Sequence, residues 1–245
     1  MSPTKARFTS LDVAAATTEL HALASGHRIA NVYDLSPKTY LLKLYKPDAP
    51  LLLLLLESGV RTHLTAYHRD KSNVPSAFTM KLRKHIRSKR IEKIEQVGTD
   101  RLVVITVGSG ELAHHLVIAL YDRGNVILTD ANHRVLTLLR ASKHDANARV
   151  NVGDEYALGA SQRLSADDVA ARLSCLADAS PSAYVQATLS RAVPLGRELV
   201  LDALVAGGVA PDTRMADLPG GALPDATREA LQQAVGYFGP ESPPP

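Results

Sequence analysis

The feature that most constrains the fold is a series of short apolar segments, each of strand length and each bounded by turn residues. The first of these segments cover residues 28–33, 39–45, 51–56 and 60–64. Pro, Gly, Asp or Ser separates each one from the next, and short β-prone segments at such spacing predict an antiparallel meander. In the second segment Tyr40 and Leu42 share one face and Lys43 lies on the other, so we expect one face of this strand to be solvated.

The run from Leu51 to Leu56 is the most apolar of these segments. It is far shorter than the ~20 residues that a membrane-spanning helix needs, and the charged residue Glu57 ends it. The run therefore predicts a buried strand and no membrane segment. The N-terminus lacks the apolar core of a signal peptide, and the single cysteine, Cys175, excludes an internal disulfide. We therefore expect a reducing, cytoplasmic location.

Strand-length segments resume at about 91–97, 102–107, 113–121, 124–130 and 134–140. The residues Gly108–Gly110 and Asp122–Asn125 predict hairpin turns, because Gly and Asn accept positive φ. Two helices accompany the strands: the first covers residues 9–25, and the second runs from Pro75 to about Ser88. The predicted fold is therefore α+β, an antiparallel β sandwich or curled sheet with two helices, and we assign it to residues 1–150.

Beyond residue 150 the apolar periodicity becomes helical. The expected helices cover about 165–177, 180–191, 197–206 and 225–235, and Val193–Gly196 predicts a tight hairpin between the second and the third. Cys175 is expected to be a core thiol in the first of these helices. We assign residues 151–238 to a small all-α domain and the Pro-rich residues 239–245 to a disordered tail.

The net charge of +3 is divided unequally, with +9 in residues 1–150 and −6 in residues 151–245. The strongest positive run lies between Lys81 and Lys93, where seven Lys and Arg residues accompany a single acid, Glu92. A solvated helix face is the simplest explanation, but so many uncompensated cations repel one another and favour phosphate contact. The candidate nucleic-acid-binding residues are Lys81, Arg83, Lys84, Arg87, Lys89, Arg90 and, in a predicted hairpin turn, Arg123.

Three further polar residues have both a structural and a functional interpretation. Asp12 caps the first helix in a Thr-x-x-Asp capping box. Asp100 and Arg101 occupy a short turn between two predicted strands, where a surface salt bridge is the simplest interpretation. Arginine also offers a planar fork for a phosphate or a base edge, and a neighbouring aspartate can orient it. Spacing alone favours the structural interpretation of this turn.

No enzyme motif is present in the sequence. It contains no nucleophile elbow, phosphate-binding loop, His-Glu-x-x-His helix or dinucleotide-binding glycine pattern. His114 and His115 lie on opposite faces if their segment is a strand, so they cannot act as one pair of metal ligands. We therefore expect no enzymatic activity, no metal and no cofactor.

Seven motifs occur in one order between residues 27 and 130. They are Asn31-Val-Tyr-Asp34, Thr39-Tyr-Leu-Leu-Lys43, Leu55-Leu-Glu-Ser-Gly59, Pro75-Ser-Ala-Phe-x-Met-Lys81, Arg83-Lys-His85, Gly98-x-Asp-Arg101 and Tyr121-Asp-Arg-Gly-Asn125. Together they resemble the N-terminal domain (NFACT-N) of the nuclear export mediator factor family. The segment Pro194-Leu-Gly-Arg-Glu-Leu-Val200 is similar to the helix-hairpin-helix module of that family. The resemblance implies a first domain similar in fold to the N-terminal domain of formamidopyrimidine DNA glycosylases.

The function that this resemblance implies is ribosome-associated quality control. The module would bind tRNA, alanyl- or threonyl-tRNA in the family, and the large (60S) ribosomal subunit that still holds peptidyl-tRNA. It would support CAT tailing, the mRNA-independent addition of alanine and threonine to stalled chains. Family residues needed for this tailing match Asp12, Asp100 and Arg101. The coiled coil through which the family reaches the ubiquitin ligase Listerin lies outside this chain.

Two other functions stay open at this point. A DNA-binding, glycosylase-like enzyme would agree with the implied fold, but Pro3 is not terminal and no acid follows it directly. A protein-interaction scaffold could use the basic helix to dock an acidic partner. The hairpin has one glycine, Gly196, and lies in the acidic half of the chain, so we expect it to be structural or protein-facing.

Overall fold

The computed structural model describes residues 7–67, 70–72, 74–141, 150–158, 164–178 and 180–238. The chain forms two compact units. The first holds Met1–Phe8, Ala15–Val97 and Arg101–Ala160, and the second holds Thr9–Ala14, Gly98–Asp100 and Ser161–Pro245. The second unit thus includes two short pieces from the N-terminal half of the chain. The tail predicted for residues 239–245 lies outside the described residues.

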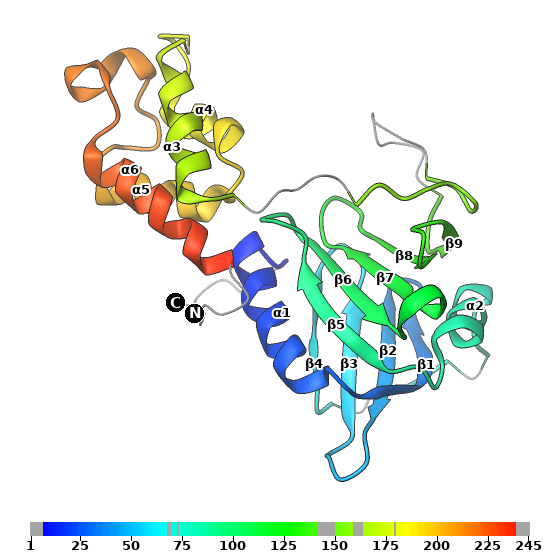
Figure 1. Cartoon of the computed structure of the whole chain (residues 1–245). Coiled ribbons are helices and arrows are strands. Elements are labelled where there is room, and N and C mark those ends of the chain that lie inside the picture. Colours follow the sequence, from blue (N-terminus) through cyan, green and yellow to red (C-terminus); the bar gives the residue numbers. More distant parts are fainter. Residues whose placement is uncertain are drawn as a thin grey trace. The chain divides into compact units, whose positions relative to one another are not determined.

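The first unit contains a four-stranded antiparallel sheet in the order β1-β2-β3-β4 (Figure 1). Its strands are β1 (Arg28–Ser36), β2 (Thr39–Tyr45), β3 (Leu52–Glu57) and β4 (Arg61–Leu64). The leucine run forms β3, as predicted, and Leu54 to Leu56 are completely buried. On the face of β2 that was predicted to be solvated, Leu41 is buried, Lys43 is half-buried and Tyr45 is 51% exposed, so this face is solvated only towards the end of the strand. On the other face, the ring of Phe78 meets Tyr40 edge-on at a centroid distance of 5.3 Å.

The second sheet of this unit has five antiparallel strands in the order β5-β6-β7-β8-β9. They are β5 (Ile91–Gln96), β6 (Leu102–Val107), β7 (His114–Ala119), β8 (Asn125–Asp130) and β9 (Val135–Leu138), and the 3-10 turn η1 (Gly110–Leu112) joins β6 to β7. One face, which includes Val104 and Val117, packs against Val150, Tyr156 and Leu158. The edge strand β9 is covered as well, because the Val135 N–H donates to the Asp154 carbonyl at 2.9 Å.

Backbone hydrogen bonds join the two sheets. The Ile29 N–H donates to the Lys89 carbonyl at 3.0 Å, and the Ile91 N–H donates to the His27 carbonyl at 2.8 Å. The chain therefore continues from one sheet into the other through the residues that precede β5. The predicted α+β architecture with two antiparallel sheets is confirmed.

Two helices accompany the sheets. α1 (Ser10–Ala24) contributes residues to both units, and α2 (Ala77–Ile86) lies beside β1 and β9 (Figure 1). The carboxylate of Asp34 accepts hydrogen bonds from the Ser76 N–H at 3.1 Å and from the Ser76 hydroxyl at 2.6 Å, which fixes the start of α2 to the end of β1. α2 ends earlier than predicted, because Ser88 takes a φ of +66° and its N–H donates to the Ile29 carbonyl.

The second unit is helical. It contains α3 (Ala166–Ser174), η2 (Cys175–Asp178), α4 (Val185–Ala192), α5 (Arg197–Ala206), η3 (Met215–Asp217), η4 (Pro219–Gly221), α6 (Asp225–Ala234) and η5 (Val235–Phe238). The capping box predicted at Ser165 and Asp168 is present. The core of the unit is made by buried aliphatic side chains from all four α-helices, among them Val169, Leu189 and Leu231.

Two expectations for this unit are wrong. The helix predicted from residue 180 begins only at Val185, because the Val185 N–H donates to the Thr213 carbonyl and the Met215 N–H donates to the Ala183 carbonyl, both at 2.9 Å. The residues before α4 thus pair with a distant segment. Cys175 is exposed and is not a core thiol. Within the described ranges, no helix has the length and apolar character to cross a membrane.

Candidate nucleic-acid interface

Asp12 lies in the first turn of α1 and forms the predicted capping box with Thr9. Its carboxylate accepts hydrogen bonds from the Thr9 N–H at 2.7 Å and from the Thr9 hydroxyl at 2.9 Å. In return, the Thr9 hydroxyl accepts from the Asp12 N–H at 3.3 Å. One carboxylate oxygen receives both bonds from Thr9, so the side chain is held at a fixed position at the start of the helix. Asp12 also makes a further interaction.

Asp100 and Arg101 lie in the turn that joins β5 to β6. Gly98 takes a φ of +56° there, and the Val97 N–H donates to the Leu102 carbonyl at 2.9 Å across the turn. Asp100 is exposed and Arg101 is half-buried, and each of the two residues makes further interactions. The Arg101 carbonyl accepts from the Leu120 N–H at 2.8 Å, which ties the turn to the end of β7.

The second unit contains both the start of α1 and the residues Gly98–Asp100. Two of the three predicted tailing residues, Asp12 and Asp100, therefore belong to one compact unit although they are distant in sequence. Arg101 follows Asp100 directly and is the first residue of the next segment of the first unit. The sequence could not reveal this grouping, because it depends on contacts with the helices beyond residue 160.

The basic run divides into cations that bind the protein itself and cations that face solvent. The guanidinium of Arg83 donates to the Val32 carbonyl at 2.8 Å, and that of Arg87 donates to the Ala30 carbonyl at 3.2 Å. Arg90 forms an ion pair with Glu92 at 2.8 Å. Within the described part of the chain, Lys81 and Lys84 are exposed and form no hydrogen bond or ion pair, so they are the cations of this run best placed for an external phosphate.

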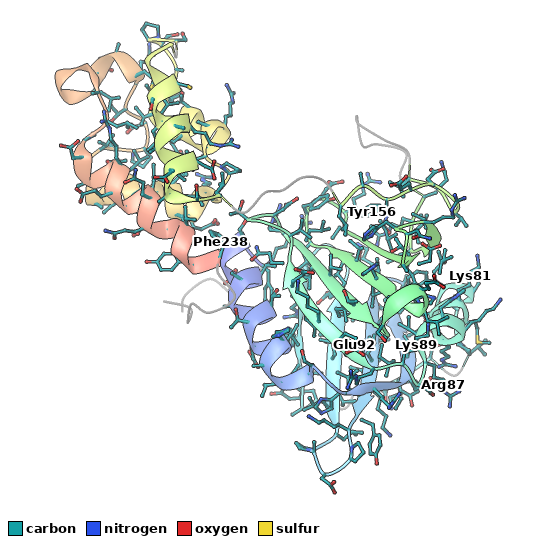
Figure 2. The ribbon with its side chains drawn as sticks, in the orientation of Figure 1. Lys81, Arg87, Lys89, Glu92, Tyr156 and Phe238 are labelled. Carbon is teal, nitrogen blue, oxygen red and sulfur yellow. The ribbon has the colours of Figure 1, made fainter. Side chains whose placement is uncertain are left out.

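Lys89 belongs to a cluster of basic groups, with His114 and His85, that the sequence did not reveal. Its ammonium group donates to the Leu112 carbonyl at 2.7 Å and lies 2.9 Å from Nδ1 of His114. The His114 ring is 5.4 Å from the ring of His85 on α2. Figure 2 shows Lys81, Arg87 and Lys89 on the side of the first unit where α2 lies. His114 lies on β7, and the helical periodicity of residues 77–86 gives no information about a residue on a distant strand. The sequence therefore did not predict the cluster.

Burial and crowding of charge change the titration of this cluster. Burial lowers the pKa of His85, and the nearby His114, Lys84, Lys89 and Lys81 lower it further. Burial likewise lowers the pKa of His114, an effect that its hydrogen bond to the Leu112 carbonyl partly opposes. Burial also lowers the pKa of Lys89. These imidazoles therefore favour their neutral form near neutral pH.

His115 points away from this cluster, as the alternation of a strand predicts. Its Nδ1 lies 3.2 Å from the Thr106 hydroxyl, and its ring stacks on that of His133 at 4.7 Å. Burial lowers the pKa of His115, and the neighbouring His133 and His114 lower it further. The adjacent pair of histidines is thus divided between two surroundings.

Arg123 lies in the turn between β7 and β8, where its side chain is exposed. Its carbonyl accepts a hydrogen bond from the Arg140 guanidinium, and the carbonyl of the adjacent Asp122 accepts one from Arg7 at 3.1 Å. Because Leu102 pairs with Ala119, the turn that carries Arg123 and the residue Arg101 lie at the same end of the second sheet. Arg123 and Arg101 therefore define one end, which we call the Arg101 end.

Lys89 is not at the Arg101 end. Lys89 contacts Leu112 and His114, which lie at the opposite end of β6 and β7. A strand of six residues separates the two ends, which is roughly 20 Å at the usual rise per residue. The predicted nucleic-acid-binding residues Lys89 and Arg123 consequently lie at opposite ends of the second sheet.

Solved structures establish the fold class. The N-terminal domain of the fibronectin-binding protein PavA from Streptococcus pneumoniae is similar, with 26% identity and a TM-score of 0.55 over 61% of this chain and 63% of that one. The fibrinogen-binding protein from Staphylococcus aureus has a TM-score of 0.63 at 17% identity and covers 96% of this chain and 83% of its own, which shows a shared fold.

The sequence matches the family model described as NFACT N-terminal and middle domains over residues 9–236, and the chain belongs to this family. Its relatives include the ribosome quality control complex subunit NEMF of Mus musculus, 39% identical over 206 residues, or 83% of this chain and 19% of the relative. The ribosome quality control complex subunit 2 of Schizosaccharomyces pombe is 39% identical over 199 residues, or 75% of this chain and 19% of the relative. The chain thus spans about a fifth of the length of these relatives.

Proposed function

We propose that this chain is a tRNA-binding module of a ribosome-associated quality control protein. Its relatives carry the name ribosome quality control complex subunit, and the chain aligns with their sequences over most of its length. The partners in this proposal are alanyl- or threonyl-tRNA and the large ribosomal subunit with its peptidyl-tRNA. A Listerin-type ubiquitin ligase would be reached through other parts of the full-length protein. The proposed location is the cytoplasm.

The observation that carries the proposal is the fixed placement of Asp12 and Asp100 within one compact unit, with Arg101 adjacent in the chain. The Arg101 guanidinium can donate two parallel hydrogen bonds to a phosphate or to a base edge. The carboxylates of Asp12 and Asp100 can accept from amino or hydroxyl groups of the RNA. A cation next to hydrogen-bond acceptors can contact base edges and hydroxyl groups as well as phosphates. This combination suits the recognition of a folded RNA such as tRNA.

Lys81, Lys84 and Arg123 have a different part in this proposal. They are exposed side chains, and they would contact phosphates without regard to sequence. The module would hold and orient tRNA, and the ribosome would form the peptide bond, so we propose no catalytic step for this chain. The quality control names of the relatives do not favour a DNA glycosylase.

Binding at a series of salt concentrations tests this function. The chain is titrated against tRNA, an isolated anticodon stem-loop and duplex DNA. The matched variants are Arg101→Ala and Arg134→Ala, because Arg134 is also exposed and lies in the turn at the far end of the same sheet. We expect a preference for tRNA near physiological salt that Arg101→Ala abolishes and Arg134→Ala preserves. Equal binding of all three ligands with a steep salt slope would reduce the module to a general polyanion binder.

Nuclease treatment distinguishes this function from that of a scaffold that binds proteins. Ligands retained by the chain would survive nuclease treatment if an acidic protein docks on α2. In our proposal the retained material is RNA, and nuclease removes it.

A further inference from the structure

We infer that Thr99 is a positioning residue for Asp100 and Arg101, and that the Val193–Gly196 hairpin is the anchor to which it binds. The inference rests on the proposed function and extends it to a residue and an element without an assigned role. It starts from a single side chain. Thr99 is 8% exposed although it lies in a short turn, and its hydroxyl donates to the Pro194 carbonyl at 2.5 Å.

Backbone bonds between Val97 and Leu102 and between Leu120 and Arg101 hold the two ends of the turn that carries Asp100, and the Thr99 bond holds its middle. Gly98, with a φ of +56°, has no side chain to pack against its surroundings. Asp100 is exposed. The buried Thr99 side chain between them is therefore the part of the turn that is held on the second unit, to which Gly98–Asp100 belong. A bond at Thr99 restricts the directions in which the next two side chains can point.

The packing of the hairpin fixes the position of the Pro194 carbonyl, which accepts the bond from Thr99. Val193 and Leu195, which flank Pro194, are 0% and 1% exposed and belong to the core of the second unit. The Leu195 N–H donates to the Val193 carbonyl at 2.8 Å across the proline. Both neighbours of the acceptor are thus packed, and the proline ring restricts the backbone further.

The hairpin also packs against the start of α1, where Asp12 lies. Gly196 takes a φ of +95°, and a Cβ atom placed there would be 3.4 Å from the Ser10 hydroxyl oxygen. One hairpin therefore contacts both segments that carry predicted tRNA-binding residues, through Pro194 on one side and Gly196 on the other. All of these residues lie within the second unit.

In this arrangement the hairpin anchors the turn at Thr99 and does not bind phosphate. The N–H of Leu195 is already used within the hairpin, and its buried side chain faces the core. The carbonyl of Pro194 is the group directed at Thr99, and a carbonyl repels phosphate. Reversing the charge at Arg191 and Arg197, on either side of the hairpin, should accordingly reduce tRNA binding less than reversing it at Lys81 and Lys84.

The test compares Thr99→Val, which keeps the shape and removes the hydroxyl, with Thr99→Ser, which keeps the hydroxyl. The matched control is Thr62→Val, because Thr62 is also buried and its hydroxyl donates to a backbone carbonyl, that of Leu55, at 3.1 Å. The first readout is the ratio of tRNA affinity to duplex DNA affinity at fixed salt. We expect Thr99→Val to lower this ratio about fivefold, the usual worth of one net hydrogen bond. Thr99→Ser and Thr62→Val should leave it unchanged.

A double-mutant cycle separates positioning from a general loss of stability. If Thr99 acts through Asp100 and Arg101, Thr99→Val should have no further effect on the ratio in a chain that already carries Asp100→Ala and Arg101→Ala together. The positioning role is overturned if the effect of Thr99→Val on the ratio multiplies with the effect of the changes in the turn. It is also overturned if Thr62→Val lowers the ratio as much as Thr99→Val does.

Hydrogen exchange provides a readout that does not depend on tRNA. Amides of residues 98–101 should exchange faster in Thr99→Val than in Thr99→Ser, while the amides of β8 should be unaffected. Unchanged exchange in the turn overturns the inference whatever the binding results. If exchange responds as expected but the unmodified chain shows no preference for tRNA, the proposed function fails, and Thr99 positions the turn without a role in tRNA binding.

Discussion

Gly59 and Gly124 pack backbone against backbone where the turns of the two sheets meet. A Cβ atom on Gly124 would lie 1.9 Å from the Gly59 nitrogen, and one on Gly59 would lie 2.9 Å from the Arg123 carbonyl carbon. The Gly59 N–H also donates to the Ala119 carbonyl at 3.2 Å. Both glycines belong to motifs that resemble those of the family, so part of that resemblance reflects the joining of two sheets and not nucleic-acid contact.

Gly124→Ala should destabilise the first unit strongly. The added methyl group would overlap backbone atoms that cannot move aside as a side chain does, so we expect a loss of more than about 3 kcal/mol in the free energy of unfolding. The control is Gly110→Ala, where φ is also positive, at +60°, but no atom lies within 4 Å of the added Cβ. That change should cost about 1 kcal/mol, from backbone strain alone. Equal effects in denaturant titrations would contradict the close contact.

Asp12 can be tested for separate structural and functional roles. Asp12→Asn keeps an oxygen that accepts from Thr9 and removes the negative charge, whereas Asp12→Ala removes both. We expect Asp12→Ala to lower the stability of α1 by about 1 kcal/mol, and Asp12→Asn to change it little. Both should weaken tRNA binding if the charge contacts tRNA. Normal tRNA binding by Asp12→Asn would leave Asp12 with a capping role only.

The basic run should separate into binding and structural residues. Replacing Lys81 and Lys84 by alanine should leave the melting temperature nearly unchanged and reduce the slope of log affinity against log salt by about 2, since each phosphate contact contributes about 0.9. Arg83→Ala should instead destabilise the fold by about 1 kcal/mol, because it loses the bond to the Val32 carbonyl and the contact with the Tyr33 ring. Thermal melts and salt-titrated binding distinguish the two sets, and a stable Arg83→Ala would show that its backbone contact is dispensable.

Acid should destabilise the first unit through its histidines. The pKa values of His85, His114 and His115 are lowered in the folded state, mainly by burial, so the unfolded chain binds protons more readily. The stability that these neutral rings contribute is present above their unfolded pKa of about 6.5 and is lost as the pH falls from there towards the lower folded values. We expect the melting temperature to fall between about pH 7.5 and about pH 5.5.

The control for this pH dependence is the double variant His85→Gln with His114→Gln. It removes two of the three groups concerned, so its melting temperature should fall less steeply over the same pH range. An identical slope in the variant and the unmodified chain would assign the acid sensitivity to other groups.

Local patterns predicted the elements of the fold well. The apolar alternation and the turn residues identified the strands of both sheets, and the Thr9–Asp12 and Ser165–Asp168 capping boxes marked two helix starts. These features depend on residues close together in the chain. The late start of α4 was missed because residues 181–185 bond to residues 213–216, a competition that no local pattern contains.

The sequence by itself determined the antiparallel strands, the helical second half and the position of the charged turn at Asp100 and Arg101, and left open whether the strands form a sandwich or one curled sheet. Only the tertiary structure decided that Leu41 of β2 is buried, that Arg83 and Arg87 bind carbonyls of β1, and that Thr99 binds Pro194. Periodicity records which side chains share a face of one element. Whether a second layer covers that face, and which distant carbonyl accepts a given donor, depends on the packing of elements far apart in the chain.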